Sequence, residues 1–202
     1  MSGAVLLLAA GASSRWGAVG PKALLPWDGE PLVGRLARAA VASGAAPVVR
    51  VLGAHADKIQ VAAPAPAGVV DVVNHGWAAG MGDSIACGLR AVLRITPETS
   101  AVVILPCDQP LVTAEVLRAC LANLGGAPDR IVQCDYGDGA CGPPVAFGRA
   151  FFPELLALTG DEGGRALVRR HADARTLLPF SGGKWDIDSP ADLARFSSKS
   201  PL

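Results

Sequence analysis

The sequence lacks several features on which common classes of protein depend. Aromatic residues make up only 5% of the chain, and 18 basic residues balance 18 acidic ones. A balanced charge excludes a global field that would attract nucleic acid or an anionic membrane, so any anion site must be local. No stretch approaches the ~20 apolar residues of a membrane span, and the first apolar run has neither the basic leader nor the cleavage site of a signal peptide. We therefore expect a cytoplasmic protein.

Metal, redox and dinucleotide motifs are also missing where they would be expected. The five cysteines form no Cys-x-x-Cys pair, and none of the three histidines has metal-ligand spacing or a triad-like setting. Scattered cysteines in an odd number favour reduced structural thiols over metal or redox use. The loop after the first apolar run matches neither the Walker loop nor the dinucleotide fingerprint, which also needs an acid at the end of the next strand. A Rossmann dehydrogenase is therefore the least favoured class of enzyme.

The composition that remains is half apolar and rich in alanine and glycine, which is typical of parallel strands covered by closely packed helices. Apolar runs alternate with helix-spaced patterns in a β-α-β-α-β series. We predict one α/β domain over residues 1–197, with a mostly parallel central sheet, and a frayed tail at 198–202. After the first run, strands are expected at 47–52, 69–73, 101–105, 131–134 and 145–148, the last of them short and open to an antiparallel pairing, with edge strands at 175–179 and 184–187. Helices are expected to begin at Pro31, to span 55–63, 114–123, 149–158 and 163–171, and to begin again at Pro190.

The first apolar run ends in a loop suited to an anion. Gly11 and its small neighbours let the backbone pass close to a ligand, and free N–H groups there can point at anionic oxygens. Arg15 and Lys22 add cations, and Lys22 lies in a segment that apolar neighbours anchor. The glycine and hydroxyls alone also fit an ordinary strand–helix turn in which Ser13 or Ser14 caps a helix. The Pro-Lys pair favours the phosphate site.

Carboxylates follow the ends of two later strands. Asp108 comes just after 101–105, and ligands of an open parallel sheet gather outside the carboxyl ends of its strands. A carboxylate there suits Mg²⁺ held against phosphates. The alternative is a helix cap or turn, although Thr113 is the better cap for the next helix. Asp186 and Asp188 lie one residue apart on a predicted strand and share a face, so one of them would complete a cation site with Asp108.

Two glycine-rich stretches complete the candidate site. The stretch 74–85 leads into a helix whose first turn holds Asp83 and Ser84, an arrangement that places backbone and hydroxyl donors at a ligand edge. The alternative is an ordinary helix capped by Asp83. The stretch 135–144, rich in glycine and proline, is interpreted as a turn that forms a polar rim, and such rims often admit a second substrate.

These motifs occur in the order found in a known family. The match runs from about residue 4 to residue 196 and comprises Leu8-Ala9-Ala10-Gly11-x-Ser-Ser-Arg15-x-Gly17 with Lys22-x-Leu-Leu, Asn74, Trp77-x-x-Gly80-Met81-x-x-Ser84, Cys107-Asp108-Gln109-Pro110-Leu111-Val112, Gly142-x-Pro144-Val145-x-Phe147, Gly160-Asp161-x-Gly163 and Asp186-Ile187-Asp188-Ser-Pro. Together they resemble the molybdenum cofactor cytidylyltransferase family of the MobA-like NTP transferase superfamily, whose members modify molybdopterin.

The resemblance implies a Rossmann-like three-layer sandwich of the nucleotidyltransferase (GT-A-like) type, with Mg²⁺ held by Asp108 and Asp188. It assigns catalytic roles to Arg15, Lys22 and Asp108. The nucleotide would contact Leu8, Ala9, Ala10, Gly11, Ala12, Ser13, Lys22, Asn74, Gly80, Met81 and Ser84. The acceptor would contact Gln109, Gly142, Pro143, Pro144 and Asp186.

The reaction that the resemblance implies is transfer of CMP from CTP to the terminal phosphate of molybdopterin or of the molybdenum cofactor, with release of pyrophosphate. Cytidylyl members of the family carry Leu-Ala-Ala-Gly where guanylyl members carry Leu-Ala-Gly-Gly, and this chain has the former. A phosphate monoester, with a second pKa of about 6, is already mostly ionised near neutral pH, so the attack needs no general base. A molybdoenzyme would be the client, and neither nucleic acid nor a membrane is expected as a partner.

Two departures from the family pattern keep other functions open. The family's Gly-His-Pro is here Gly142-Pro143-Pro144, and Gly20-Pro21 resembles nucleotidyltransferases for sugar phosphates and methylerythritol phosphate. One alternative is therefore a nucleotidyltransferase for a sugar or isoprenoid phosphate. The other is a non-catalytic accessory or carrier protein for a molybdenum hydroxylase, against which the retention of Lys22, Asp108 and Asp188 argues.

Overall fold

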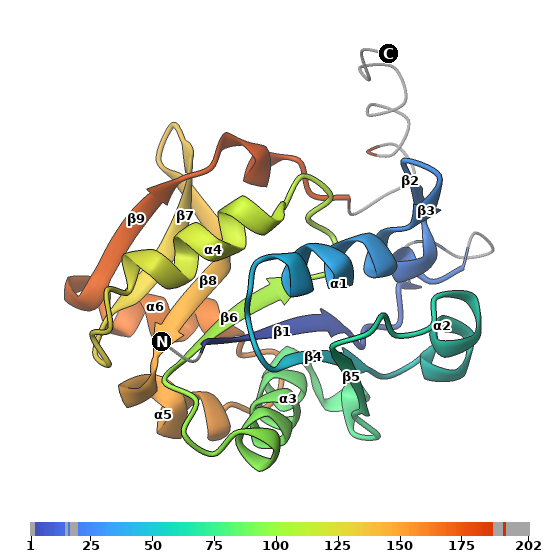
Figure 1. Cartoon of the computed structure of the whole chain (residues 1–202), viewed down its shortest axis with the longest axis horizontal. Helices are drawn as coiled ribbons and strands as arrows, with labels where there is room; N and C mark the ends of the chain where they lie inside the picture. Colours follow the sequence, from blue (N-terminus) through green and yellow to red (C-terminus); the bar gives the residue numbers. More distant parts are fainter. Residues whose placement is uncertain (1–2, 15, 17–19, 188–191, 193–202) are drawn as a thin grey trace.

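A single seven-stranded sheet organises the protein. The computed structural model describes residues 3–14, 16, 20–187 and 192. The strand order is β5-β4-β1-β6-β8-β7-β9, as can be followed in Figure 1. The strands of this sheet are β1 (Gly3–Ala9), β4 (Val48–Leu52), β5 (Val69–Val73), β6 (Ala101–Pro106), β7 (Ile131–Gly137), β8 (Ala140–Gly148) and β9 (Arg175–Pro179). A separate two-stranded ribbon joins β2 (Pro26–Trp27) to β3 (Glu30–Pro31).

The sheet is mostly parallel, as predicted. The strand β1 pairs in parallel with β4 and β6, and β4 pairs in parallel with β5. The strand β8 runs antiparallel to both of its neighbours, β6 and β7, which confirms the antiparallel alternative for 145–148. Because all the parallel strands point the same way, the carboxyl ends of β1 and β6 meet at one edge of the sheet.

Helices cover both faces of the sheet and give three layers (Figure 1). The helices α1 (Leu32–Ala42) and α4 (Ala114–Asn123) lie over one face, and α3 (Met81–Ile95), α5 (Phe152–Leu156) and α6 (Gly164–Arg170) lie over the other. The short helix α2 (Ala56–Ala62) adds Ile59 to the core on the α1 side. The predicted α/β sandwich is therefore the observed architecture.

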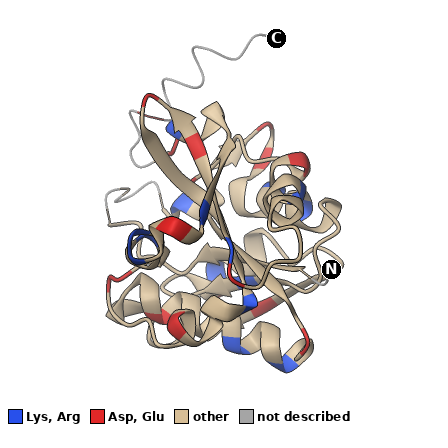
Figure 2. Cartoon of the chain, turned by 90° about the vertical axis from the view of Figure 1, so that its left-hand side faces the viewer, with Lys and Arg blue, Asp and Glu red and all other residues tan. Residues whose placement is uncertain are grey.

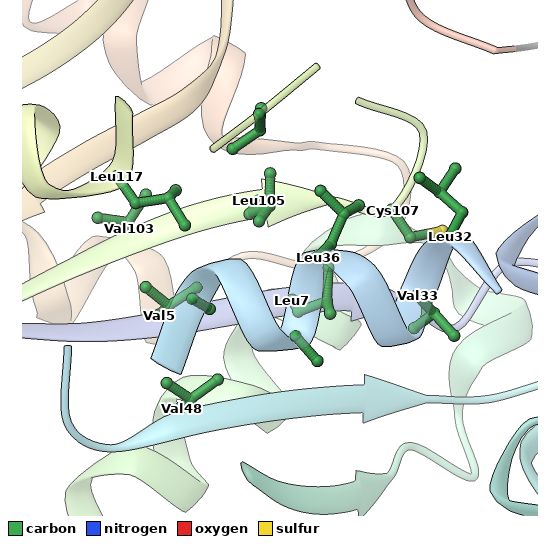
Figure 3. Close-up of a cluster of buried hydrophobic side chains, with 14 of the residues drawn as sticks. Val5, Leu7, Leu32, Val33, Leu36, Val48, Val103, Leu105, Cys107 and Leu117 are labelled. Carbon is green, nitrogen blue, oxygen red and sulfur yellow. The ribbon is translucent and has the colours of Figure 1, made fainter. Parts of the chain in front are cut away.

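The central strands are buried on both faces, which explains their unbroken apolar runs. Every residue of β1 is buried, and its alternate side chains enter the two separate cores. Figure 3 shows the core under α1, where Leu36 and Val33 of the helix lie over Leu7 and its neighbours in the sheet. This packing fixes the end of β1, and with it the loop that follows.

The segment 135–144 differs from the prediction of a turn with a polar rim. Most of it belongs to the hairpin of β7 and β8, and only Asp138 and Gly139 form the turn, both with positive φ. Such an Asp-Gly pair is the sequence signal of a tight two-residue hairpin. The register shifts near Pro143 and Pro144, because proline has no backbone N–H for the ladder.

The edge strand predicted at 184–187 is wrong. The chain forms a 3₁₀ turn at Ser181–Lys184 instead. A Cβ built on Gly183 would lie 1.8 Å from Cε1 of Tyr136, so the backbone turns directly against that ring, as only glycine allows. Except for Asp192, which is helical, the helix predicted from Pro190 lies outside the described residues, as does the tail at 198–202.

Charges of both signs are spread over several elements in Figure 2, consistent with the even charge balance of the sequence. Among the described residues, no helix is long and apolar enough to cross a membrane.

Candidate functional site

A cavity of about 450 Å³ opens at the carboxyl ends of β1 and β6. This volume lies in the range of small-molecule sites. Its wall includes every residue predicted to contact the nucleotide except Asn74, and it also includes Asp108. The other lining residues are Ser14, Trp16, Pro21, Ala23, Ile59, Trp77, Ala78, Pro106, Cys107 and Asp161. Residues far apart in sequence therefore converge at the predicted edge of the sheet.

The loop after β1 is tied to the segment that carries Lys22. Ser13 has a positive φ of 54°, and its hydroxyl accepts the backbone N–H of Lys22 at 3.0 Å. Ring nitrogen Nε2 of His55 lies 2.9 Å from the carbonyl oxygen of Ala12. The alternative in which Ser13 caps a helix is not observed, because the Ser13 side chain ties the loop to the 3₁₀ turn Lys22–Leu24.

Lys22 and Asp108 face each other at the cavity. The ammonium Nζ donates to Oδ2 of Asp108 at 2.9 Å, and the two side chains are 18% and 24% exposed. Pro21 and Ala23 are buried and anchor the backbone on each side of the lysine. A cation and a carboxylate that remain accessible in a cavity are available to a charged ligand.

The first turn of α3 supplies the opposite wall. Ser84 is 4% exposed, and its hydroxyl accepts from Nδ2 of Asn74 at 3.1 Å, so Asn74 supports the wall from behind it. The helix begins after Gly80, which has no side-chain cap and a positive φ of 138°. The interpretation of Asp83 as the cap is wrong, because Asp83 Oδ2 instead accepts the backbone N–H of Gly160 at 2.8 Å.

The residues predicted to contact the acceptor lie outside the wall of this cavity. Gln109 is 4% exposed, and its Oε1 has no partner within the described part of the chain. On β8, the carbonyl oxygen of Pro143 accepts from the Tyr136 hydroxyl at 2.5 Å. Burial raises the pKa of Tyr136, and the charges of Asp186 and Asp108 raise it further. Tyr136 therefore lies in the electrostatic field of both carboxylates, on the β8 side of Asp108.

Two of the predicted site residues, Arg15 and Asp188, lie outside the described residues. Ile187, the residue before Asp188, lies beside Asp108, because its backbone N–H donates to the carbonyl oxygen of Asp108 at 3.0 Å. Over residues 3–14, 16, 20–187 and 192, no three histidine, cysteine or acidic side chains gather into a metal site. The accessible oxygens of Asp108 are of the kind that Mg²⁺ prefers, and Mg²⁺ commonly uses only one or two carboxylates together with phosphates.

The cysteines are not joined by disulfides. All five are free, and Cys107, Cys120 and Cys134 are buried. Burial, assisted by the adjacent Asp108 carboxylate, raises the pKa of Cys107 to about 12. Although Cys107 lines the cavity, it is therefore protonated at neutral pH and is a poor nucleophile.

Sequence reasoning gave no site role to several lining residues. Trp77 and Asp161 belong to motifs of the resemblance but were assigned no contact, and Ile59 projects from a helix predicted only as an element. The spacing of apolar positions marks Ile59 as buried but not as facing a cavity. The loop that carries Asp161 contacts α3, and no local sequence pattern predicts this contact.

The fold and the cavity together define a class. A mostly parallel sheet with helices on both faces, a small-residue loop after β1, and a lysine–carboxylate pair at the strand ends are features of enzymes that handle nucleoside triphosphates. The model of the MobA-like NTP transferase domain matches residues 5–175. The chain therefore belongs to the MobA-like NTP transferase family.

Known proteins resemble the chain over nearly its whole length. Nicotine blue oxidoreductase of Paenarthrobacter nicotinovorans is 32% identical over 199 residues, which is 94% of each chain. The crystal structure of Rv0371c from Mycobacterium tuberculosis H37Rv is 31% identical, with a TM-score of 0.81 over 98% of this chain and 99% of that one. Another structure of Rv0371c, 30% identical and with a TM-score of 0.77 over 99% of this chain and 100% of that one, is a complex with manganese. A nucleotidyl transferase from Methanothermobacter, 20% identical with a TM-score of 0.79, covers 98% of this chain and 96% of that one and supports the fold.

Proposed function

We propose that the protein transfers CMP from CTP to the terminal phosphate of molybdopterin or of the molybdenum cofactor and releases pyrophosphate. The observation that carries this proposal is the Lys22–Asp108 pair at 2.9 Å, in the same cavity as the loop after β1. The choice of CTP rests on Leu8-Ala9-Ala10-Gly11, the form that the resemblance associates with cytidylyl transfer. The choice of acceptor rests on the resemblance alone.

The triphosphate would lie against the loop after β1. Gly11 and Ala12 are exposed, so their backbone N–H groups are accessible to phosphate oxygens. Lys22 would turn from Asp108 to the phosphates and steady the pyrophosphate as it leaves, and Arg15 is proposed to assist. A divalent cation, held by Asp108 and Asp188, would neutralise charge on the phosphate oxygens when bound. The Ile187 backbone N–H donates to the carbonyl oxygen of Asp108, so the chain lies beside Asp108 one residue before Asp188. This contact supports the proposal of Asp188 as the second metal ligand.

The reaction is a displacement at the α-phosphorus. A phosphate oxygen of the acceptor forms a bond to this phosphorus, and the bond to the β-phosphate oxygen breaks and carries its electron pair into pyrophosphate. The attacking phosphate is already ionised, so no side chain has to remove a proton. The protein contributes positioning and electrostatic stabilisation, which are the main sources of catalysis in phosphoryl transfer.

The acceptor is proposed to approach from the β8 side of Asp108, opposite α3. Gly142, Pro143 and Pro144 lie on β8, the strand next to β6, Gln109 directly follows Asp108, and the charges of Asp186 and Asp108 both act on Tyr136. A different phosphorylated acceptor would use the same nucleotide side of the cavity. A sugar or isoprenoid phosphate therefore remains the second candidate, and a non-catalytic carrier for a molybdenum hydroxylase is the third.

The similarity to nicotine blue oxidoreductase raises a candidate from another class, hydride transfer. The strand β4 ends in Gly53-Ala54-His55, without the acid that holds a ribose in dinucleotide folds. The missing acid argues against this candidate. Measuring NAD(P)H oxidation beside the transferase assay tests it directly.

The deciding experiment measures pyrophosphate release from CTP, with Mg²⁺ or Mn²⁺, in the presence of molybdopterin, the molybdenum cofactor, simple sugar phosphates or no acceptor. We expect release only with a molybdopterin-type acceptor. Release with a sugar phosphate but not with a molybdopterin-type acceptor would favour the second candidate, a nucleotidyltransferase for a sugar or isoprenoid phosphate. No release with any acceptor, together with tight binding of the cofactor, would favour the carrier.

A further inference from the structure

A distant loop is docked on the first turn of α3. The backbone N–H of Gly160 donates to Oδ2 of Asp83, and the N–H of Gly82 donates to the carbonyl oxygen of Gly160, both at 2.8 Å. A Cβ on Gly80 would lie 2.2 Å from the carbonyl carbon and oxygen of Gly160. The loop, residues 159–163, therefore contacts the helix backbone directly, and only glycine permits this approach.

This docking brings one more carboxylate to the cavity. Asp161 lines the same cavity as Lys22 and Asp108. Met81 and Trp77 line the same cavity, and their apolar surfaces can pack against a flat ring; a Cβ on Gly163 of the loop would lie 3.1 Å from the sulfur of Met81. Within the described part of the chain, the Asp161 carboxylate has no hydrogen bond and no ion pair. It is exposed, and when ionised it can only accept hydrogen bonds.

The Asp161 carboxylate is not expected to contact the phosphates of a triphosphate, because two anions repel each other. The candidate donors on a nucleoside triphosphate are its hydroxyls and the N–H groups of its base. Trp77 and Met81 line the same cavity and offer apolar surface, which suits a base more than a ribose. Cytosine carries an exocyclic amino group where uracil carries a carbonyl oxygen, so a carboxylate facing that position accepts from the former and repels the latter.

We infer that Asp161 is a specificity residue that accepts a hydrogen bond from the exocyclic amino group of the nucleobase and thereby selects CTP against UTP. The inference rests on the proposed function, since it assumes that the cavity binds a nucleoside triphosphate. Asp83 is a positioning residue in this scheme, because it holds the loop through Gly160 without lining the cavity.

The test measures dissociation constants for CTP and UTP with Mg²⁺ by titration calorimetry. The wild type is expected to bind CTP about tenfold or more tightly than UTP, the effect of one hydrogen bond to a charged group. Asp161→Asn is expected to reduce this ratio to near one, because an amide can both donate to uracil and accept from cytosine. The matched control is Glu162→Gln, which removes the same charge from a neighbouring exposed side chain that does not line the cavity.

Asp83→Ala, which removes the acceptor of the Gly160 N–H, tests the positioning step. It is expected to lower the ratio of the two dissociation constants while its thermal unfolding midpoint shows that the protein is folded. A merely structural role would weaken CTP and UTP binding by equal factors and leave the ratio unchanged.

The outcomes separate this inference from the proposed function. If the wild type binds CTP but does not discriminate against UTP, or if Asp161→Asn leaves the ratio unchanged, the inference is overturned and the proposed transferase stands. If the wild type binds no nucleoside triphosphate, the proposed function fails and the inference fails with it.

Discussion

The buried Arg50–Asp71 pair offers a prediction about stability whose size follows from the geometry. Arg50 on β4 is 0% exposed. Its Nε and Nη2 donate to the two carboxylate oxygens of Asp71 on β5, each at 2.7 Å, and its Nη1 donates to the carbonyl oxygen of Ala63 at 2.8 Å. The guanidinium thus depends on one carboxylate for its charge balance.

Replacing that carboxylate leaves a buried cation without compensation. Asp71→Asn is expected to lower the free energy of unfolding by about 3–5 kcal/mol, the usual cost of removing one partner of a buried pair. For a chain of this size, each kcal/mol corresponds to roughly 2–4 °C in the unfolding midpoint. A fall of about 10 °C is therefore expected in a thermal scan, and urea denaturation should give the matching loss of free energy.

The control is an exposed pair. Arg170 and Glu154 lie 3.1 Å apart, with side chains 52% and 39% exposed, and Nε2 of the partly exposed His171 lies 2.7 Å from the other oxygen of the same carboxylate. Glu154→Gln should therefore cost about 1 kcal/mol or less. The double variant Arg50→Met with Asp71→Leu should recover most of the loss, because it leaves no unpaired charge. If Asp71→Asn destabilised the protein no more than Glu154→Gln does, the reasoning about the buried guanidinium would be refuted.

Two other predictions concern the cavity. Lys22→Ala should weaken CTP binding about 10-fold or more and lower turnover as well, because it removes a charge-assisted contact. The control is Lys58→Ala on the exposed side of α2, which should change neither CTP binding, measured by calorimetry, nor turnover, measured by pyrophosphate release. Because burial raises the pKa of Cys107 to about 12, its thiolate should appear only as the pH approaches that value. Mass spectrometry after alkylation at pH 9 should therefore show modification at the partly exposed Cys141 well before Cys107, and early loss of Cys107 would contradict this protection.

The parallel sheet and the edge at which the cavity opens were predictable because their signals are local. The unbroken run of β1 marks a strand buried on both faces, and the small residues that follow it mark a loop that a ligand can approach. Asp108 was placed at the site by the rule that ligands gather at strand ends. Lys22 was placed by its anchored neighbours, and both residues do line the cavity.

The errors arose where distant contacts decide the structure. The partner of Asp83 is Gly160, which is 77 residues away, so a residue interpreted as a helix cap instead docks a loop. The 3₁₀ turn that contains Gly183 lies against the ring of Tyr136. The presence of a glycine in the sequence does not show where that ring lies, so the turn could not be predicted from it. The Asp138–Gly139 hairpin is a different case, since its turn signal was present in the sequence and was overlooked in a stretch rich in glycine and proline.

The central claim is that the ends of β1 and β6 hold a metal-bound triphosphate, with Asp108 as a metal ligand. The most direct test compares wild type and Asp108→Asn for pyrophosphate release from CTP in the presence of the acceptor and Mg²⁺, with the thermal unfolding midpoint measured for both. We predict that turnover falls by about 10²-fold or more while the midpoint changes little, because the carboxylate is partly exposed and serves the ligand rather than the core. Full activity of Asp108→Asn with Mg²⁺ would contradict the claim.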